Sequence, residues 1–410
     1  MNALVVHYHE IGLKGRNRQF FEETLVKNLR RALRGTAYAR VRRGFGRVTV
    51  DFDDDAFVDE AARRSARVFG VANVGAGVRT ELSLDEMKRV SLELMQAQPF
   101  GSFAVRARRT HSRFDRRSGD VNVVVGQHIK DATGARVDLK RPEATLRIEL
   151  FGNTCIVYRS RLEGPGGLPA GVSGRMLALV SGGIDSPVAA WLMARRGAEI
   201  ELVHFHGQPY TDPSSIRQAS ELAEVLALYG LRTTLHLIAL ADAQREIVLA
   251  APSNLRIVLY RRTMLRIAAA LAEERGAQAV ITGDSLGQVA SQTIENIATV
   301  DAAVPGLQVL RPLIGSDKQE IVDRAARIGT LGISTRRYQD CCVLFEPRSP
   351  TTRATATMAE EAEASIDLDA LVGKALAGRE THVFELPPPR AVGTAASGDD
   401  LLESTPVKGI

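Results

Sequence analysis

Cysteine is scarce in this sequence of 410 residues: there are only three. Three thiols cannot build a disulfide framework, so the reducing cytoplasm is the expected location. No apolar run approaches the roughly 20 residues that a membrane-spanning helix needs, so no membrane partner is expected. The first residues also lack the charged-then-apolar layout of a signal peptide. These absences argue against both a secreted disulfide-rich protein and a membrane protein.

Acidic residues are scarce in the first part of the chain. Residues 1–163 carry 30 Lys and Arg against 20 Asp and Glu, whereas residues 164–410 carry 23 against 28. The net charge of +5 therefore hides a front half of +10 and a back half of −5. A basic excess of this size favours a polyanionic partner. A scattered, solvated basic surface would give the same count.

The chain also lacks the Gly-x4-Gly-Lys pattern of a Walker loop, yet it has another glycine-rich turn. The apolar run 176–180 predicts a buried parallel strand, and 187–196 predicts a helix. Between them, residues 181–186 read Ser-Gly-Gly-Ile-Asp-Ser. Small residues there let backbone amides surround an anion at a helix N-terminus, with Ser186 as the expected N-cap and Pro187 as the first helical residue. We therefore predict a phosphate site at this turn.

Strand and helix patterns alternate on both sides of a Gly- and Pro-rich stretch, which predicts an α/β protein. Beyond that stretch the alternation predicts a doubly wound parallel sheet with its ligand at the strand C-termini. The expected divisions are 1–55, 56–163, a linker at 164–174, 175–385, and a polar, proline-rich tail at 386–410 that is expected to be disordered.

Finer features are also predicted. Capping boxes predict helix starts at Ser83 with Glu86 and at Ser316 with Gln319. The segment 103–110 alternates apolar and basic residues, which predicts a strand with one cationic face. Cys155 lies within an expected strand, where a small core residue is the simplest interpretation.

Several stretches resemble known families. The Ser-Gly-Gly-x-Asp-Ser turn is similar to the PP-loop of the ATP pyrophosphatase superfamily, whose members hold pyrophosphate while they transfer AMP to a carbonyl oxygen. The stretches 203–206 (Val-His-Phe-His) and 282–293 (Thr-Gly-Asp-Ser-Leu-Gly-Gln-Val-Ala-Ser-Gln-Thr) resemble the catalytic domain of 4-thiouridine synthetases, the ThiI family of tRNA sulfurtransferases. Residues 9–18 resemble the motif of that family's ferredoxin-like domain, with His9 in place of the usual glycine, and 56–163 resemble its RNA-binding THUMP domain.

The resemblance implies an enzyme that uses ATP, accompanied by Mg²⁺, to convert uridine at position eight of tRNA to 4-thiouridine. Uridine O4 would be adenylated, and a cysteine persulfide would then supply sulfur as AMP leaves. The expected catalytic residues are Asp185, which is also the expected metal ligand, and Cys341 or Cys342 as the sulfur carrier, with a slight preference for Cys341. A buried structural cysteine pair is the alternative for that segment. His204 and His206 alternate along one strand, and we do not expect them to bind a metal.

The remaining implied contacts form two sets. The ATP pocket is expected to be lined by Leu179, Val180, Ser181, Gly182, Gly183, Ser186, His204, Phe205, Arg261, Gly283 and Gln292. RNA phosphates are expected at Lys14, Arg16, Arg18, Arg106, Arg108 and Arg109, positioning the RNA without reading its sequence.

The sulfur source and the rival functions follow from what is missing. Longer family members carry a rhodanese domain with a further cysteine that also serves thiamine thiazole synthesis, but the last cysteine here is Cys342. A cysteine desulfurase is therefore the expected direct donor, and the thiamine link is disfavoured. The oligomeric state stays open, a homodimer included. The alternatives are another PP-loop enzyme, such as a 2-thiouridylase or an amidotransferase synthetase, and a non-catalytic tRNA-binding protein.

Overall fold

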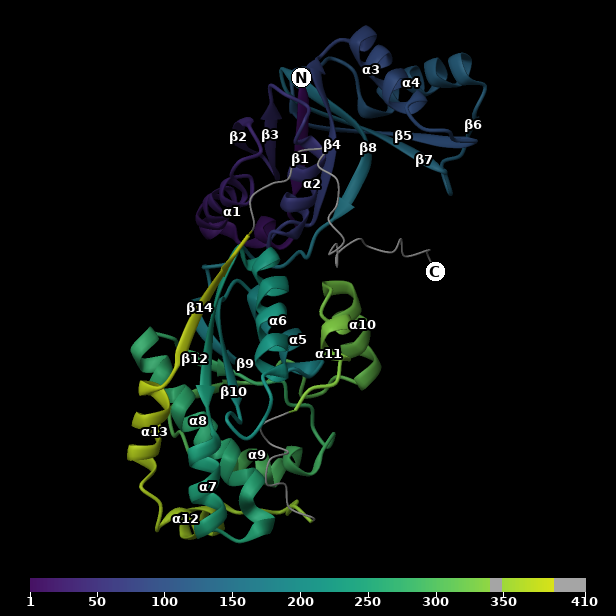
Figure 1. Cartoon of the computed structure of the whole chain (residues 1–410). Helices are drawn as coiled ribbons and strands as arrows, with labels where there is room; N and C mark the ends of the chain where they lie inside the picture. The colour runs from purple at the N-terminus through teal and green to yellow at the C-terminus, as the bar shows by residue number, and fades with distance from the viewer. Residues whose placement is uncertain (340–348, 387–410) are drawn as a thin grey trace. The chain divides into compact units, whose positions relative to one another are not determined.

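The computed structural model describes residues 1–339 and 349–386 and divides into two compact units, Met1–Pro169 and Ala170–Leu386 (Figure 1). The boundary between the units falls inside the glycine-rich stretch 164–174. Cys341, Cys342 and all but the first residue of the expected tail lie outside the described residues. Within the described part of the chain, no helix has the length and apolar character needed to cross a bilayer.

Unit 1 is built on an eight-stranded sheet in the order β2-β3-β1-β4-β8-β7-β5-β6. Its strands are β1 (Asn2–His7), β2 (Tyr38–Gly44), β3 (Arg47–Phe52), β4 (Asn73–Glu81), β5 (Ser102–Ser112), β6 (Arg136–Val137), β7 (Ala144–Gly152) and β8 (Thr154–Glu163). Its helices are η1 (Glu10–Leu13), η2 (Gly15–Asn17), α1 (Arg18–Ala32), α2 (Val58–Arg67), α3 (Leu84–Gln96) and α4 (Ser118–Thr133). β5 pairs in parallel with β6 and β7, and the other pairs are antiparallel. One sheet therefore joins the strands before and after residue 55.

The alternation along β5 sorts its side chains as the sequence predicts. Val105 is buried in a core made by α3, α4, β5 and β7, whereas Arg106 and Arg108 are exposed. Cys155 belongs to the same core and is fully buried, which confirms its expected role. Burial raises the pKa of its thiol to about 12, so the reactive thiolate is disfavoured.

Unit 2 is built on a six-stranded sheet in the order β13-β12-β9-β10-β11-β14. Its strands are β9 (Arg175–Leu179), β10 (Glu199–His206), β11 (Arg232–Ala239), β12 (Ala279–Ile281), β13 (Gln308–Leu310) and β14 (Glu380–Glu385). Five of them are parallel, as predicted, while β14 adds an antiparallel edge to β11. The chain order reverses on the two sides of β9, which makes the end of β9 the switch point where ligands bind in such sheets.

Helices cover both faces of this sheet (Figure 1). They are α5 (Asp185–Arg195), α6 (Ser214–Gly230), α7 (Ala241–Ala250), η3 (Ser253–Leu255), α8 (Arg256–Arg275), η4 (Ala290–Gln292), α9 (Ile294–Asp301), α10 (Lys318–Ile328), α11 (Leu331–Ser334), α12 (Ala356–Glu363) and α13 (Leu368–Ala377). The main core packs α7 and α8 against apolar side chains of β9, β10, β11 and β12. The sequence patterns did not predict α7, α9, α11, α12, α13, β13 or β14.

The helix after β9 begins earlier than its sequence predicts. The N-cap position is Ile184, so Ser186 and Pro187 lie inside the first turn and the predicted cap is wrong. The physical reason is that the Ser186 hydroxyl is used elsewhere, since it accepts a hydrogen bond from the Ser181 amide at 2.9 Å. Ser186 thus closes the loop.

Both predicted capping boxes are also wrong. Ser83 holds the N-cap position of α3 without a side-chain cap, because Glu86 pairs with Arg89 at 2.8 Å. α10 does have a capping box, but it is formed by Asp317 and Glu320, one residue further along than predicted. Asp317 caps the helix in place of the neighbouring serine, because its carboxylate accepts a hydrogen bond from the Gln319 amide at 2.8 Å.

Candidate functional site

The loop after β9 is closed on itself by serine hydroxyls. The amide of Ser181 donates to Ser186 Oγ at 2.9 Å, and the amide of Gly183 donates to Ser181 Oγ at 3.2 Å. Ser334 Oγ donates to the Gly183 carbonyl at 3.2 Å from α11. The loop therefore holds a fixed shape at the positive end of α5, where an anion is stabilised.

Two glycines are required here by close approach. A Cβ on Gly182 would lie 2.6 Å from Gln218 Oε1 and 3.0 Å from the Tyr338 ring. A Cβ on Gly283 would lie 2.7 Å from the Ser186 amide nitrogen. The segment after β12 therefore packs directly on the loop after β9, as expected for two strands that end at the same sheet edge.

Asp185 meets two residues that sequence reasoning missed. Lys318 Nζ lies 2.6 Å from its Oδ1, and Gln288 Nε2 donates to its Oδ2 at 3.1 Å. Gln288 lies within the stretch 282–293 that resembles the 4-thiouridine synthetases, and that resemblance was the sequence signal that could have identified it. Lys318 is the first residue of α10, and no local pattern marks it, because the contact spans 133 residues.

The strand-end residues lie together at this edge. The Val180 amide donates to the Val203 carbonyl at 2.8 Å, and His204 Nδ1 lies 2.9 Å from the Val180 carbonyl oxygen. His204 is buried, and Phe205 belongs to the main core of the unit. The structure thus brings the residues after β9 and at the end of β10 together as predicted.

Arg261 and Gln292 meet at a buried carboxylate. Arg261 Nη2 donates to both oxygens of Asp284, at 2.6 and 2.7 Å, and Gln292 Nε2 donates to Oδ1 at 3.2 Å. Burial would raise the pKa of Asp284, but Arg261, Thr282 and Arg311 together hold it below its usual value. Asp284 is therefore a permanent anion that sequence reasoning did not single out.

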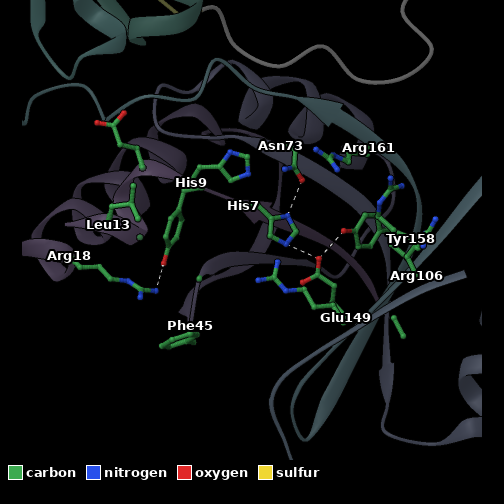
Figure 2. A pocket seen from close by; sticks show the side chains of 17 residues that line it. His7, His9, Leu13, Arg18, Phe45, Asn73, Arg106, Glu149, Tyr158 and Arg161 are labelled. Carbon is green, nitrogen blue, oxygen red and sulfur yellow. Dashed lines mark hydrogen bonds and ion pairs between the residues drawn. The ribbon is translucent and has the colours of Figure 1, made fainter. Parts of the chain in front are cut away.

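Unit 1 contains a cavity of about 780 Å³ lined by arginines and aromatic rings. Figure 2 shows His7 at its wall, with Nδ1 3.0 Å from Asn73 Oδ1 and Nε2 2.7 Å from Glu149 Oε1. Tyr158 donates to the same carboxylate at 2.8 Å. Burial would raise the pKa of Glu149, but His7 and Arg47 hold it below its usual value. This buried network keeps the cavity wall rigid.

The cavity gathers three of the six expected RNA contacts, Arg18, Arg106 and Arg108. It adds Arg147 of β7 and Arg161 of β8, which sequence reasoning missed because neither lies in the basic runs at 14–18 and 106–109.

The other three expected RNA contacts are not part of this lining. Lys14 lies 3.6 Å from Glu10, Arg109 donates to the Ser112 carbonyl at 3.1 Å, and Arg16 is exposed. The structure thus divides the six residues into a cavity set and a surrounding set.

Phe45 lies between this cavity and a second one. The second cavity, of about 560 Å³, is lined among others by Arg42, Arg43 and Arg79. Phe45 lines both cavities, is 62 % exposed, and has the Arg18 guanidinium 4.8 Å from its ring centroid. An exposed ring between two arginine-lined hollows is a surface that suits unpaired nucleotides.

Comparison with known proteins covers almost the whole chain. Family descriptions match three stretches: the ThiI ferredoxin-like domain at residues 3–75, the THUMP domain at 81–159, and "Thiamine biosynthesis protein (ThiI)" at 171–368. A probable tRNA sulfurtransferase of Nocardia farcinica is 40% identical over 414 residues, covering 99% of both chains. The chain belongs to the ThiI family.

Other ThiI family members support the same assignment. A probable tRNA sulfurtransferase of Thermus thermophilus is 43% identical and covers 94% of both chains. A crystal structure of a 4-thiouridine synthetase–RNA complex with bound ATP is 35% identical, with a TM-score of 0.84 over 94% of this chain and 100% of that one. The α/β fold with ferredoxin-like, THUMP and PP-loop parts is thus the fold of the ThiI family, as predicted.

The residues of this ThiI family member fit a magnesium ion that accompanies ATP. Among the described residues, no group of three or more His, Cys, Asp or Glu side chains could hold a metal on its own. Mg²⁺ commonly takes one or two carboxylates together with substrate phosphates and water. Asp185 supplies one partly exposed carboxylate beside the loop, and its neighbours hold it in place.

Proposed function

We propose that this chain is an ATP-dependent tRNA uracil 4-sulfurtransferase of the cytoplasm that acts on the uridine at position eight. The observation that carries the proposal is the self-closed loop of residues 181–186, with Asp185 at its mouth, in a chain similar over 94% of its length to a 4-thiouridine synthetase bound to RNA and ATP. ATP would supply the leaving group that uridine O4 lacks. The end of β9 would then be the adenylation site.

The phosphates of ATP are assigned to the loop and its neighbours. The amides of the loop and the N-terminus of α5 would bind the departing pyrophosphate, because both present positive dipole ends. Asp185 would hold Mg²⁺, which screens the charge of the phosphates. Lys318, 2.6 Å from Asp185, would leave that carboxylate to the metal and bind a phosphate oxygen directly.

RNA binding is assigned to unit 1. Its +10 charge and its two arginine-lined cavities supply the phosphate contacts, and Phe45 offers a face on which a base can stack. The cavity set would hold an unpaired segment, while Lys14, Arg16 and Arg109 would contact the flanking backbone. These contacts position the substrate and carry little sequence information.

Sulfur is assigned to Cys341 or Cys342, received from a cysteine desulfurase. The last described residues before these cysteines are Tyr338 and Gln339. Tyr338 packs on Gly182, and the Gln339 amide donates to Ser214 Oγ at 3.2 Å. The terminal sulfur of the persulfide would displace AMP from C4 of the uridine, which leaves that sulfur in a disulfide with the carrier cysteine. A second thiol would then attack the carrier sulfur and break the S–S bond, releasing 4-thiouridine and leaving a disulfide that an external thiol reduces.

The test is the nucleoside content of tRNA. Mass spectrometry of tRNA from cells that lack the gene should show no 4-thiouridine, and a plasmid copy should restore it. A copy with Cys341 and Cys342 both replaced by serine should not restore it, whereas Cys155→Ser should. Loss of a 2-thiouridine instead would identify a 2-thiouridylase, and unchanged nucleosides would leave a tRNA-binding protein.

A further inference from the structure

Asp284 is a buried carboxylate that none of the roles above uses. It is 5 % exposed and stands three residues after the end of β12. Four side chains donate to its two oxygens: Arg261 from α8, Gln292 from η4, Arg311 after β13 at 3.1 Å, and Thr282 at 2.8 Å. A buried carboxylate with this many charged and neutral donors has a single orientation.

Two of these donors, Arg261 and Gln292, are expected ATP contacts, and each has hydrogen-bonding groups beyond those that bind Asp284. Arg261 uses Nη2 on Asp284 and Nη1 on the Ser291 carbonyl at 2.8 Å, which fixes the plane of its guanidinium. Gln292 uses Nε2 on Asp284, and its Oε1 is buried without a hydrogen-bond partner among residues 1–339 and 349–386. A buried acceptor in this position indicates a missing donor group.

The physical benefit of such a hub is preorganisation. A free arginine loses rotamer freedom when it binds a ligand, whereas an arginine that is already held loses little. We propose that Asp284 is the positioning residue of the ATP site, holding Arg261 and Gln292 in the orientation that meets the nucleotide. The proposal rests on the ATP contacts assigned to those two residues, and Asp284 itself would not touch ATP.

The chain provides a matched control in Glu363. This carboxylate is also 5 % exposed, and it accepts from Arg262 at 2.9 Å and from Arg266 at 2.8 Å. Arg262 and Arg266 belong to α8, as Arg261 does, but neither is an expected ATP contact. Replacing either acid with its amide leaves buried guanidinium groups without a countercharge, so both changes should lower stability.

The test is the Kd of ATP for the full chain, measured below the melting temperature of each variant. Asp284→Asn should raise it about tenfold, because the carboxamide offers an N–H group where a donor already points. Glu363→Gln should leave it within twofold, even if the two variants lose a similar number of degrees in melting temperature. Equal effects of the two substitutions on Kd would show that Asp284 is only structural and would overturn the proposal.

Two further variants separate this proposal from the assignment of the ATP contacts. Arg261→Gln should raise Kd about tenfold. Adding Asp284→Asn to it should raise Kd by only about threefold more, since of the two ATP contacts that Asp284 holds only Gln292 is then left. If the effects of the two substitutions on Kd multiply, the positioning role of Asp284 is contradicted, whereas the ATP contact of Arg261 stands. An unchanged Kd in Arg261→Gln would refute the contact, and the proposal with it. If Asp284→Asn does not fold, Thr282→Val should raise Kd about threefold, and no change would count against the proposal.

Discussion

Lys318 shows how a residue without a local signature enters a site. It begins α10 behind a capping box of Asp317 and Glu320, and that box fixes where its side chain starts. Its ammonium group then reaches Asp185 across 133 residues of sequence. The Lys318 side chain is 48 % exposed, so it can exchange Asp185 for a phosphate oxygen without first breaking a buried ion pair.

We expect Lys318→Met to raise the KM for ATP about tenfold, because one positive charge beside the phosphates is lost. Asp185→Ala should be more severe and should abolish tRNA-dependent release of pyrophosphate, since it removes the carboxylate that we propose as the Mg²⁺ ligand. Pyrophosphate release measured at varied ATP concentration checks both. Lys140→Met, an exposed lysine of unit 1, should leave the KM for ATP unchanged. A Lys318→Met variant with the normal KM would contradict the role of Lys318.

Gly283 makes a second prediction at the scale of a single residue. Gly283→Ala places a methyl group 2.7 Å from the Ser186 amide nitrogen, so the loop or the segment after β12 must shift. ATP affinity should fall at least tenfold, as a displaced loop no longer aims its amides at the phosphates. Gly332→Ala, where nothing lies within 4 Å of the added group, is the control and should bind ATP normally. Isothermal titration with ATP decides between the two outcomes.

At the scale of elements, a buried ionic cluster joins β10, β11, β14 and α8. Glu201 of β10 accepts from His236 of β11 at 2.9 Å and from Arg275 of α8 at 2.9 Å. The other nitrogen of His236 lies 3.1 Å from the Thr381 hydroxyl of β14. The edge strand β14 is thus attached by side chains as well as by its backbone ladder.

This cluster should make unit 2 sensitive to acid. Burial would raise the pKa of Glu201, but His236 and Arg275 outweigh it and lower the pKa to about 2. A depressed carboxyl pKa stabilises the fold fully above the unfolded value near 4.5, and this contribution disappears as the pH falls toward 2. The shift corresponds to about 3 kcal/mol at most.

The free energy of unfolding, measured from pH 7 to pH 2, checks this prediction. Glu201→Gln should lower stability at pH 7 and flatten its fall below pH 4.5. Glu199→Gln, on the same strand but exposed, should keep the slope of the parent protein. A Glu201→Gln variant with the same pH dependence as the parent would show that other carboxyl groups govern acid unfolding.

At the scale of the whole molecule, the sequence predicts what local patterns determine. The apolar runs 176–180 and 187–196 predicted β9 and α5, and the PP-loop lies between them as the pattern indicated. The predicted N-cap of α5 was wrong because the Ser186 hydroxyl bonds to Ser181 instead. The sequence pattern does not show which partner a serine hydroxyl takes. β14 was missed because its side chains are largely exposed and its pairing is non-local. Asp284 and Lys318 were missed because only the fold brings their partners to them.

The basic excess of the chain belongs to unit 1, which has its own sheet and cores and should therefore fold and bind tRNA alone. Residues 1–169 should bind tRNA with an affinity that falls steeply with salt, because each phosphate contact releases a counterion. Replacing Arg106 and Arg108 together with alanine should lower the slope of log K against log [salt] by about 1.5. Arg63→Ala, which removes an exposed arginine paired with Glu60 on α2, should leave the slope unchanged. Electrophoretic mobility shifts at several salt concentrations give these slopes, and salt-insensitive binding would move the RNA site away from the two arginine-lined cavities.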